Sequence, residues 1–541
     1  MHGDVKRLSI KRAPDMYRND LKQTEFVDFY MPFGGKLSTE NRWVKLAAMI
    51  PWNEIEEVYK RNLDGTGMGA PAKSGRIAFG ALVIKERLGI TDGETVEQIL
   101  ENPYLQYFLG LHEFRDKALF DPSMMVHFRC RFGQEDYDAI NTKIIDLATG
   151  GTLVKSDQPT PEDFEKGSTH TESDEDDDPP TPLPNEGKLL MDATCTPADI
   201  TYPTDLKLLN EAREKTETYI DKLHEPFIGK RKKPRSYRCK ARGQFLALIK
   251  QKKPGAKKIR KAIGQQLRFI KRNLAYIARY LEEDCGALLR LTSYNIKCLQ
   301  AIHTLYEQQL FMYENRSHSV ADRIVSISQP HVRPIVRGKA GKKVEFGAKI
   351  SISHVRGGYV SLHRLNWDAY NESSDLVSQI EAYREHFGHY PASVHADMIY
   401  RTRANRAYCK KLNIRLSGPA LGRPRKVTAE NAADLKAQKK LTRQDELDRI
   451  PVEGKFGNAK RKGTLARIMA KLSRTSESVI NIGLIVLNLD TWLRAVLLAL
   501  RLKFENFARW LGRALRAIQG SMLPSESPMR MPRNQISRRS A

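Results

Sequence analysis

Cysteine is scarce in this 541-residue chain. Its six cysteines lie far apart, with no CxxC pair and no histidine at zinc-finger spacing, so we expect neither a zinc module nor a disulfide framework. The first residues are basic but no apolar stretch follows them, so we expect no secretory signal. Long apolar runs are also rare. The longest, residues 479–500, is interrupted by Asn481, Asp490 and Arg494, which favours a buried core helix over a membrane span.

Acidic residues are outnumbered: 64 Asp and Glu stand against 90 Lys and Arg, a formal charge of +26. Such an excess favours a polyanionic partner, and nucleic acid is the first candidate. Ribosomal, membrane-surface and heparin-binding proteins share this balance, so charge alone does not decide between them. The length exceeds one ordinary core, so we expect two or three folded units and at least one linker.

Residues 1–150 carry apolar positions at helical spacing, for example Ile77, Leu82 and Leu88. Thr91 precedes a second helical segment as a capping residue, and a third segment is predicted to start around Pro122. We therefore predict an all-α N-terminal domain that binds DNA. The basic side chains that could contact DNA phosphates, although each alone equally fits a solvated surface charge, are Arg76, Lys85, Arg87, Arg115, Arg129 and Arg131.

Residues 151–187 are rich in Asp, Glu, Pro, Ser and Thr, a composition that cannot bury enough apolar surface to fold, so we predict a disordered acidic linker. A catalytic domain is expected at residues 188–510 and a loose basic tail at 511–541. Within that domain, residues from about 206 to 328 form a basic helical insertion suited to DNA phosphates. The insertion residues that we expect to bind DNA are Lys257, Lys261, Arg268 and Arg272.

Asp192 lies inside a short apolar run that predicts a buried strand, where an unpaired carboxylate is costly unless a cation compensates it. Alternating residues 344–352, the pair Gly357-Gly358 and the run 359–365 predict a hairpin. A helix, a strand ending at Asp397, a helix, a strand and more helices follow. This is the element order of a ribonuclease H-like α/β fold with a mixed sheet, in which the first and fourth strands are parallel neighbours.

That order brings Asp192 near Asp397, and we place a third carboxylate, Glu453, on a helix packed across the sheet edge. Three carboxylates of this kind suit hard divalent cations. Gly457 and Lys460 lie four and seven residues after Glu453 and share its helix face. Pro451 fits a first helical turn, which would leave Arg449 just before the helix.

Three segments resemble the catalytic blocks of bacterial insertion-sequence DDE transposases of the insertion-sequence-five and insertion-sequence-four type. They are MDATCTPADITYPTDLKLLNEAR, ADMIYRTRANRAYCKKLNIRLSGPALGRP and RIPVEGKFGNAKRKGTL. Residues from about 26 to 141 resemble the helical N-terminal domain of the insertion-sequence-five type. Relatives carry Tyr, two residues, Arg, three residues, Glu, six residues and Lys. Here Arg449, Glu453 and Lys460 match, while Glu446 replaces the tyrosine and leaves a hairpin step open.

The resemblance implies metal-dependent cleavage of transposon ends and strand transfer into target DNA. Asp192, Asp397 and Glu453 would be the catalytic residues and the ligands of two Mg²⁺ ions, for which Mn²⁺ is expected to substitute. Double-stranded DNA, as terminal inverted repeats and as target, is the expected partner of a homodimer in the bacterial cytoplasm, at the nucleoid, with no membrane. The residues near the site that we expect to bind DNA are Arg449, Lys460, Tyr400 and Arg403.

Two other functions stay open at this stage. One is a catalytically inactive or repurposed sequence-specific DNA-binding protein, and the other is a ribonuclease H-like enzyme that acts on RNA. His395 precedes Asp397 by two residues and so faces the same side of the strand. Either a supporting role at the site or a place in the core fits this histidine, and the core is favoured.

Overall fold

The computed structural model describes residues 35–63, 71–150, 184–284, 286–339, 342–418, 422, 428, 431–461 and 463–521. Of the predicted linker, all but its last four residues lie outside these ranges, as does the tail beyond residue 521. The chain divides into two compact units, residues 1–489 and 490–541. Helix α15 (Ser473–Ser521) begins in the first unit, and its remainder makes up the described part of the second. Residues 511–521, predicted as loose tail, are thus helical.

Helices fill the described N-terminal region, as its apolar spacing predicts. Ser74 and Thr91 cap two of them by accepting hydrogen bonds from the backbone N–H groups of Ile77 and Glu94. The third predicted segment starts at Met124, two residues after the proline. The helices are α1 (Arg42–Met49), α2 (Trp52–Arg61), α3 (Gly75–Leu88), α4 (Asp92–Glu101), α5 (Pro103–Phe108), α6 (Met124–Arg131) and α7 (Gln134–Thr149).

Two of the arginines named as candidates for phosphate contact, Arg76 and Arg129, are buried in this region. The Arg76 guanidinium donates to the carbonyl oxygens of Phe108 and Tyr107, at 3.0 and 3.2 Å. Arg129 forms an ion pair with Asp92. Both cations therefore stabilise the helical packing from inside, because a buried guanidinium needs acceptors for its N–H groups.

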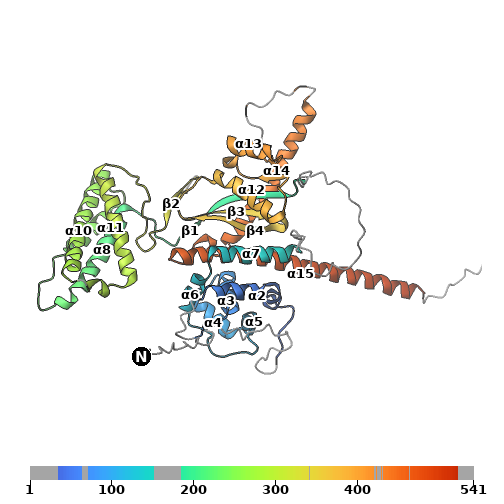
Figure 1. The fold of residues 1–541 in the computed structure, drawn as a ribbon, viewed down its shortest axis with the longest axis horizontal. Coiled ribbons are helices and arrows are strands. Elements are labelled where there is room, and N and C mark those ends of the chain that lie inside the picture. The colour runs from blue at the N-terminus through green and yellow to red at the C-terminus, as the bar shows by residue number, and fades with distance from the viewer. Residues whose placement is uncertain are drawn as a thin grey trace, which may run out of the picture. The chain divides into compact units, whose positions relative to one another are not determined.

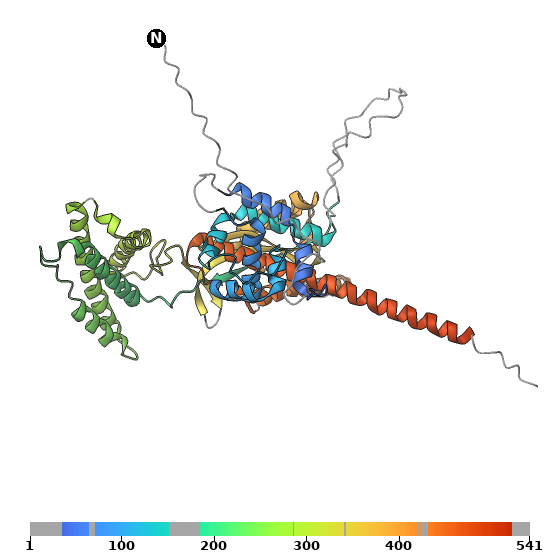
Figure 2. The ribbon, with the colours of Figure 1, turned by 90° about the horizontal axis from the view of Figure 1, so that it is seen from below.

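The insertion between β1 and β2 is a helical bundle (Figure 1 and Figure 2). It has its own hydrophobic core. Leu209, Ile220, Ile270 and Ile302 are among its fully buried residues. The 28-residue α10 is the longest of its helices, and the apolar stripe predicted along it faces this core. The helices are α8 (Asp205–His224), α9 (Arg238–Ile249), α10 (Ala256–Glu283) and α11 (Ser293–Glu314).

A six-stranded mixed sheet forms the centre of the first unit, with strand order β2-β3-β1-β5-β6 and β4 paired to β3. Strand β1 is antiparallel to β3 and parallel to β5, and β5 is parallel to β6. The chain is thus helix-rich and α/β, and the predicted hairpin is β3–β4; β2 was not predicted. The strands are β1 (Lys188–Pro197), β2 (Arg333–Lys339), β3 (Lys342–Val355), β4 (Tyr359–Asn366), β5 (Ser393–His395) and β6 (Arg415–Leu416).

Helices pack against the sheet through two separate apolar clusters. Leu189 and Met191 of β1 pack with α12 (Asp375–Phe387) and α13 (Arg403–Lys411). Leu190, the residue between them, packs with α14 (Ala432–Arg461) and the start of α15. Since neighbouring residues on a strand point to opposite faces, α12 and α13 cover one face of the sheet and α14 covers the other.

Among the described residues, one helix is long and apolar enough to cross a membrane by length and composition, residues Ser473–Leu511 of α15. In the first unit this helix is part of the core, as predicted: Ile480 and Leu484 are buried against the sheet. Asn488 is also fully buried. It accepts from the backbone N–H of Val360 at 2.9 Å and donates to Asn141 of α7 at 2.8 Å. These hydrogen bonds join α7, β4 and α15.

Candidate active site

The two predicted aspartates are brought level by the pairing of β1 with β5. The parallel register pairs Lys188 with Ser393 and Leu190 with His395. The same offset continued along both chains sets Asp397 beside Asp192. Asp397 follows β5 as the N-cap of a short 3-10 helix, and its carboxylate accepts from the backbone N–H of Met398 at 2.8 Å. The prediction that the first strand and the strand ending at Asp397 are parallel neighbours is confirmed.

Helix α14 crosses the face of the sheet that carries Asp192. Its apolar residues Val452, Phe456 and Ala459 are buried in the cluster that includes Ile350 and Ile352 of β3. Pro451 is inside this 30-residue helix, so the prediction that it opens the helix is wrong. A proline is tolerated there even though it leaves one backbone carbonyl without its helical donor. Arg449 is consequently a helical residue, one turn before Glu453.

Two cations of α14 contact the strands directly. Arg449 Nη1 lies 3.7 Å from Oδ1 of Asp397. Lys460 Nζ donates to Oγ1 of Thr194 at 2.8 Å, and Thr194 is two residues after Asp192 on the same face of β1. Glu453 lies four residues after Arg449 and seven before Lys460, on the side of the helix that both share. Its side chain is exposed.

Burial gives Asp192 an unusual protonation equilibrium. It raises the pKa of this carboxyl to about 6, and the nearby carboxylates of Asp397 and Glu372 add to the effect. The backbone N–H of Ala193, which donates to Asp192 Oδ1 at 2.8 Å, and the Arg449 guanidinium lower the pKa. A half-buried carboxyl crowded by like charges is an environment that favours a bound cation.

The three predicted carboxylates are not yet gathered. Among the described residues, the one group of three acidic or histidine side chains with ligand atoms all within 4.8 Å of one another is His395, Asp445 and Asp448. Asp192 and Asp397 interact electrostatically, and Arg449 is near both. Asp192, Asp397 and Glu453 therefore do not all come within this distance of one another, and a shared site would require movement of Glu453 toward the two aspartates.

Helix α14 has features that permit such a movement. Pro451 removes one helical hydrogen bond immediately before Glu453. Gly454 follows it, and a methyl group added there would have no atom within 4 Å. The helix is therefore weakened on both sides of Glu453, and its surface is open at Gly454.

The other residues predicted to bind DNA differ in exposure. Arg403 is exposed at the start of α13, and Lys257, Lys261 and Arg268 are exposed on α10. Arg272 is half-buried and donates to the carbonyl oxygen of Ser236 at 2.6 Å. Tyr400 is fully buried, and its ring packs in the cluster beneath α12 instead of facing DNA.

Two residues near the site, Glu372 and Thr194, were missed by sequence reasoning. Glu372 begins a 3-10 turn after β4 and forms an ion pair with Lys349 at 2.9 Å. It carries no pattern that would identify it as a neighbour of Asp192. Thr194, the partner of Lys460, carries one weak signal, because it is two residues after Asp192 on a strand.

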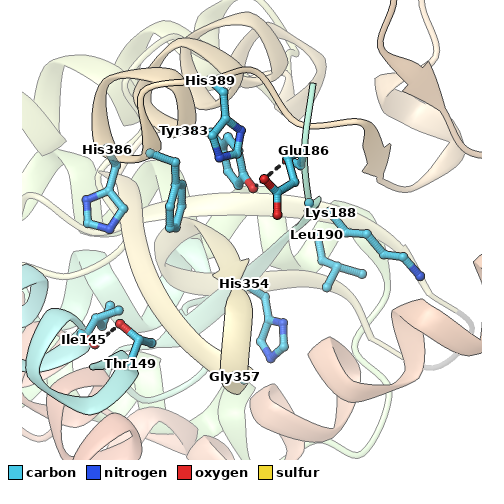
Figure 3. Close-up of a pocket in the computed structure, with 13 residues that line it drawn as sticks. Ile145, Thr149, Glu186, Lys188, Leu190, His354, Gly357, Tyr383, His386 and His389 are labelled. Carbon is cyan, nitrogen blue, oxygen red and sulfur yellow. Dashed lines mark hydrogen bonds between the residues drawn. The ribbon is translucent and has the colours of Figure 1, made fainter. Parts of the chain in front are cut away.

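A separate cavity of about 430 Å³ lies against the first residues of β1 (Figure 3). Tyr383 and His386 reach it from α12, and His354 reaches it from the end of β3. Lys188 and Leu190 line it, but Asp192, Asp397 and Glu453 do not. This cavity is therefore distinct from the candidate active site.

Comparison with known proteins yields two family matches. Residues 394–490 match a family described as "Transposase DDE domain", a segment that includes Asp397, Glu453 and Lys460. Residues 32–131 match a family described as "Transposase domain (DUF772)".

A curated relative from Rhizobium meliloti, "Uncharacterized protein ORF8 in nfe locus", is 27% identical over 169 residues, which is 31% of this chain and 68% of the relative. No solved structure matches the chain. One transposase match lies in the N-terminal helices and the other spans β5 to α15, as the resemblance in the sequence predicted. The two family matches and the relative together support an insertion-sequence DDE transposase.

Proposed function

We propose that this protein cuts the ends of its own insertion sequence and joins them to target DNA, with Asp192, Asp397 and Glu453 as the metal-binding catalytic residues. The observation that carries the proposal is the parallel pairing of β1 with β5, which places Asp192 of β1 next to Asp397 just after β5, with Arg449 of the crossing helix 3.7 Å from Asp397. The strand order and the helices on both faces support a ribonuclease H-like catalytic core.

The residues present fit a pair of hard divalent cations. The carboxyl of Asp192 is crowded by the negative charges of Asp397 and Glu372, and the Arg449 guanidinium opposes them. All three proposed ligands offer oxygen, the donor that Mg²⁺ prefers and Mn²⁺ accepts. When bound, such ions supply charge stabilisation for the attacking and leaving oxygens of phosphoryl transfer.

The chain's own side chains have separate roles in this proposal. Asp192 and Asp397 set the position of the reacting phosphate from the rigid sheet, and Glu453 closes the site from α14. Arg449 now lies against Asp397, and a cation at the carboxylates would release its guanidinium to a phosphate oxygen. Lys460, held at Thr194, is a second phosphate contact eleven residues along the same helix.

DNA is held by surfaces outside this site. The exposed Lys257, Lys261 and Arg268 of the insertion bind phosphates of the terminal inverted repeats together with the N-terminal helices. Two transposon ends must be paired for strand transfer, so the active form is a homodimer on DNA. The bacterial nucleoid is the place where such a protein finds its substrate.

The proposal is tested by metal-dependent cleavage of duplex DNA that contains the element's ends. Asp192→Asn, Asp397→Asn and Glu453→Gln should each bind the DNA as the wild type does and cut it at least about 10²-fold more slowly. Glu446→Gln, an exposed glutamate of the same helix, is the matched control and should cut at the wild-type rate.

Normal cutting by all three acidic variants would overturn the assignment of the site. A wild-type protein that binds the ends but does not cut them with Mg²⁺ or Mn²⁺ would instead indicate a repurposed DNA-binding protein. Preferential cutting of RNA would indicate a ribonuclease.

A further inference from the structure

Beside the candidate active site, a histidine and two aspartates form a second cluster of ligand atoms. His395 is the last residue of β5, and Asp445 and Asp448 lie three residues apart on α14. Their ligand atoms all lie within 4.8 Å of one another. His395 is fully buried and Asp445 is only 4% exposed. The cluster therefore joins the strand that leads to Asp397 with the helix that carries Glu453.

The imidazole of His395 is oriented as a ligand would be. Its Nε2 is 2.9 Å from Oγ of Ser393, which fixes the ring. Its Nδ1 is buried, has no hydrogen-bond partner among the described residues, and lies 3.6 Å from Oδ1 of Asp445. A buried ring nitrogen without a hydrogen bond is costly, and a cation shared with the neighbouring carboxylate would remove that cost.

Hydrogen bonds from neighbouring side chains hold the carboxylates of both aspartates in place. Arg415 donates to both oxygens of Asp445, at 2.7 and 2.8 Å. Lys188 and Gln444 donate to the two oxygens of Asp448, at 2.6 and 3.0 Å. Each carboxylate oxygen has a further lone pair for a metal, and hydrogen bonds of this kind usually hold metal-ligating carboxylates in place.

We propose that His395, Asp445 and Asp448 bind a structural divalent cation of the Mn²⁺ or Zn²⁺ type, separate from the catalytic ions. One imidazole nitrogen and two carboxylates suit these metals better than Mg²⁺, which prefers oxygen ligands alone. Arg415 and Lys188 are 38% and 54% exposed, so solvent screens their charges. The ion ties α14 to β5 one turn before Arg449 and so fixes the helix that supplies Glu453.

The test counts Mn²⁺ bound to full-length protein in which the catalytic ligands are removed by Asp192→Asn, Asp397→Asn and Glu453→Gln. This protein should bind one Mn²⁺ per chain, with a nitrogen coupling in its pulsed electron paramagnetic resonance spectrum. The Asn and Gln side chains that replace the catalytic ligands bind a cation through oxygen, so the coupling reports an imidazole. Further change of His395→Ala or Asp448→Asn should weaken binding at least about tenfold and remove or alter the coupling.

The matched control is His354→Ala, which removes another buried imidazole whose ring nitrogens have no hydrogen-bond partner among the described residues. It should leave Mn²⁺ binding unchanged. Asp448→Asn preserves the size of a side chain near the helix surface. It therefore tests metal binding even if the His395 variant folds poorly. The proposal is overturned if the starting protein binds no Mn²⁺, or if its affinity is the same in both ligand variants. Because cleavage is not measured, either result leaves the proposed function to its own test.

Discussion

The cations of the helical insertion and those of α14 are held in opposite ways. Lys257, Lys261 and Arg268 are exposed on a bundle with its own core. Arg449 and Lys460, by contrast, are held against Asp397 and Thr194 of the sheet. An exposed cation contributes attraction that salt screens, whereas a fixed cation beside carboxylates can set the geometry of a reaction. The insertion should therefore govern affinity for DNA, and α14 should govern the rate of cutting.

The largest expected effect comes from Arg449→Ala. We expect single-turnover cleavage to fall by about 10²-fold, because the variant loses a fixed positive charge at the reacting phosphate, while DNA affinity changes less than about threefold. Arg443→Ala, which removes an exposed arginine of the same helix, is the control and should retain the wild-type rate. Equal losses of cleavage rate and DNA affinity in the Arg449 variant would contradict the claim that α14 governs the rate and the insertion governs the affinity.

Two buried asparagines allow the stability of the sheet region to be compared with that of the helical insertion. Asn488 makes hydrogen bonds to Asn141 and to both backbone groups of Val360, whereas Asn273 of α10 donates one, to Thr216 at 3.1 Å. Asn488→Ala should lower the free energy of unfolding by about 3 kcal/mol and Asn273→Ala by about 1 kcal/mol. Urea unfolding measures both. A larger loss in the Asn273 variant would mean that the contact of α7 with the core contributes little.

The raised pKa of Asp192 makes stability depend on pH in the metal-free protein. The native carboxyl, with a pKa of about 6, binds its proton more tightly than the unfolded one, so wild-type stability falls as pH rises from about 4 to 6. The stability of the Asp192→Asn variant should not fall in this way, because its side chain carries no ionisable group at this position. In EDTA at pH 7.5 the variant should be more stable by up to about 2 kcal/mol after allowance for solvent screening, and the gain should vanish near pH 4. Melting temperatures that differ equally at both pH values would contradict the burial of this charge.

The smallest effects are expected in the insertion. Lys261→Ala should weaken DNA binding to all sequences alike and reduce the slope of log affinity against log salt by about 1. Arg272→Ala removes a guanidinium that stacks on Tyr237 and bonds to Ser236, so it should cost about 1 kcal/mol of stability. Binding isotherms at several salt concentrations measure the slope for Lys261→Ala, and urea unfolding measures the loss of stability for Arg272→Ala. An unchanged slope for Lys261→Ala would place the DNA elsewhere.

The spacing of apolar residues and a few turn and capping residues predicted much of the fold from the sequence. The capping residue Thr91, the glycine pair between β3 and β4, and the apolar run around Asp192 each determine local structure through their own chemistry. The parallel pairing of β1 with β5 also followed, because element order restricts the possible topologies. Asp397 could be placed for the same reason.

Other features depend on contacts that no local pattern reveals. Pro451 resembles a helix start, but the helix begins at Ala432 and tolerates the proline. Tyr400 follows a charged strand end, yet it is buried by α12. The cluster of His395 with Asp445 joins residues 50 positions apart, and only the packing of α14 on the sheet brings them together.

The closure of Glu453 onto the two aspartates is tested most directly by cleavage with Glu453→Cys in Mg²⁺ and in Mn²⁺. A thiolate is a poor ligand for Mg²⁺ and a better one for Mn²⁺, so the variant should lose at least about 10²-fold in Mg²⁺ and recover part of that loss in Mn²⁺. Glu446→Cys, on the same helix, should cut like the wild type in both metals. Wild-type cutting by Glu453→Cys in Mg²⁺ would show that this side chain does not hold the metal.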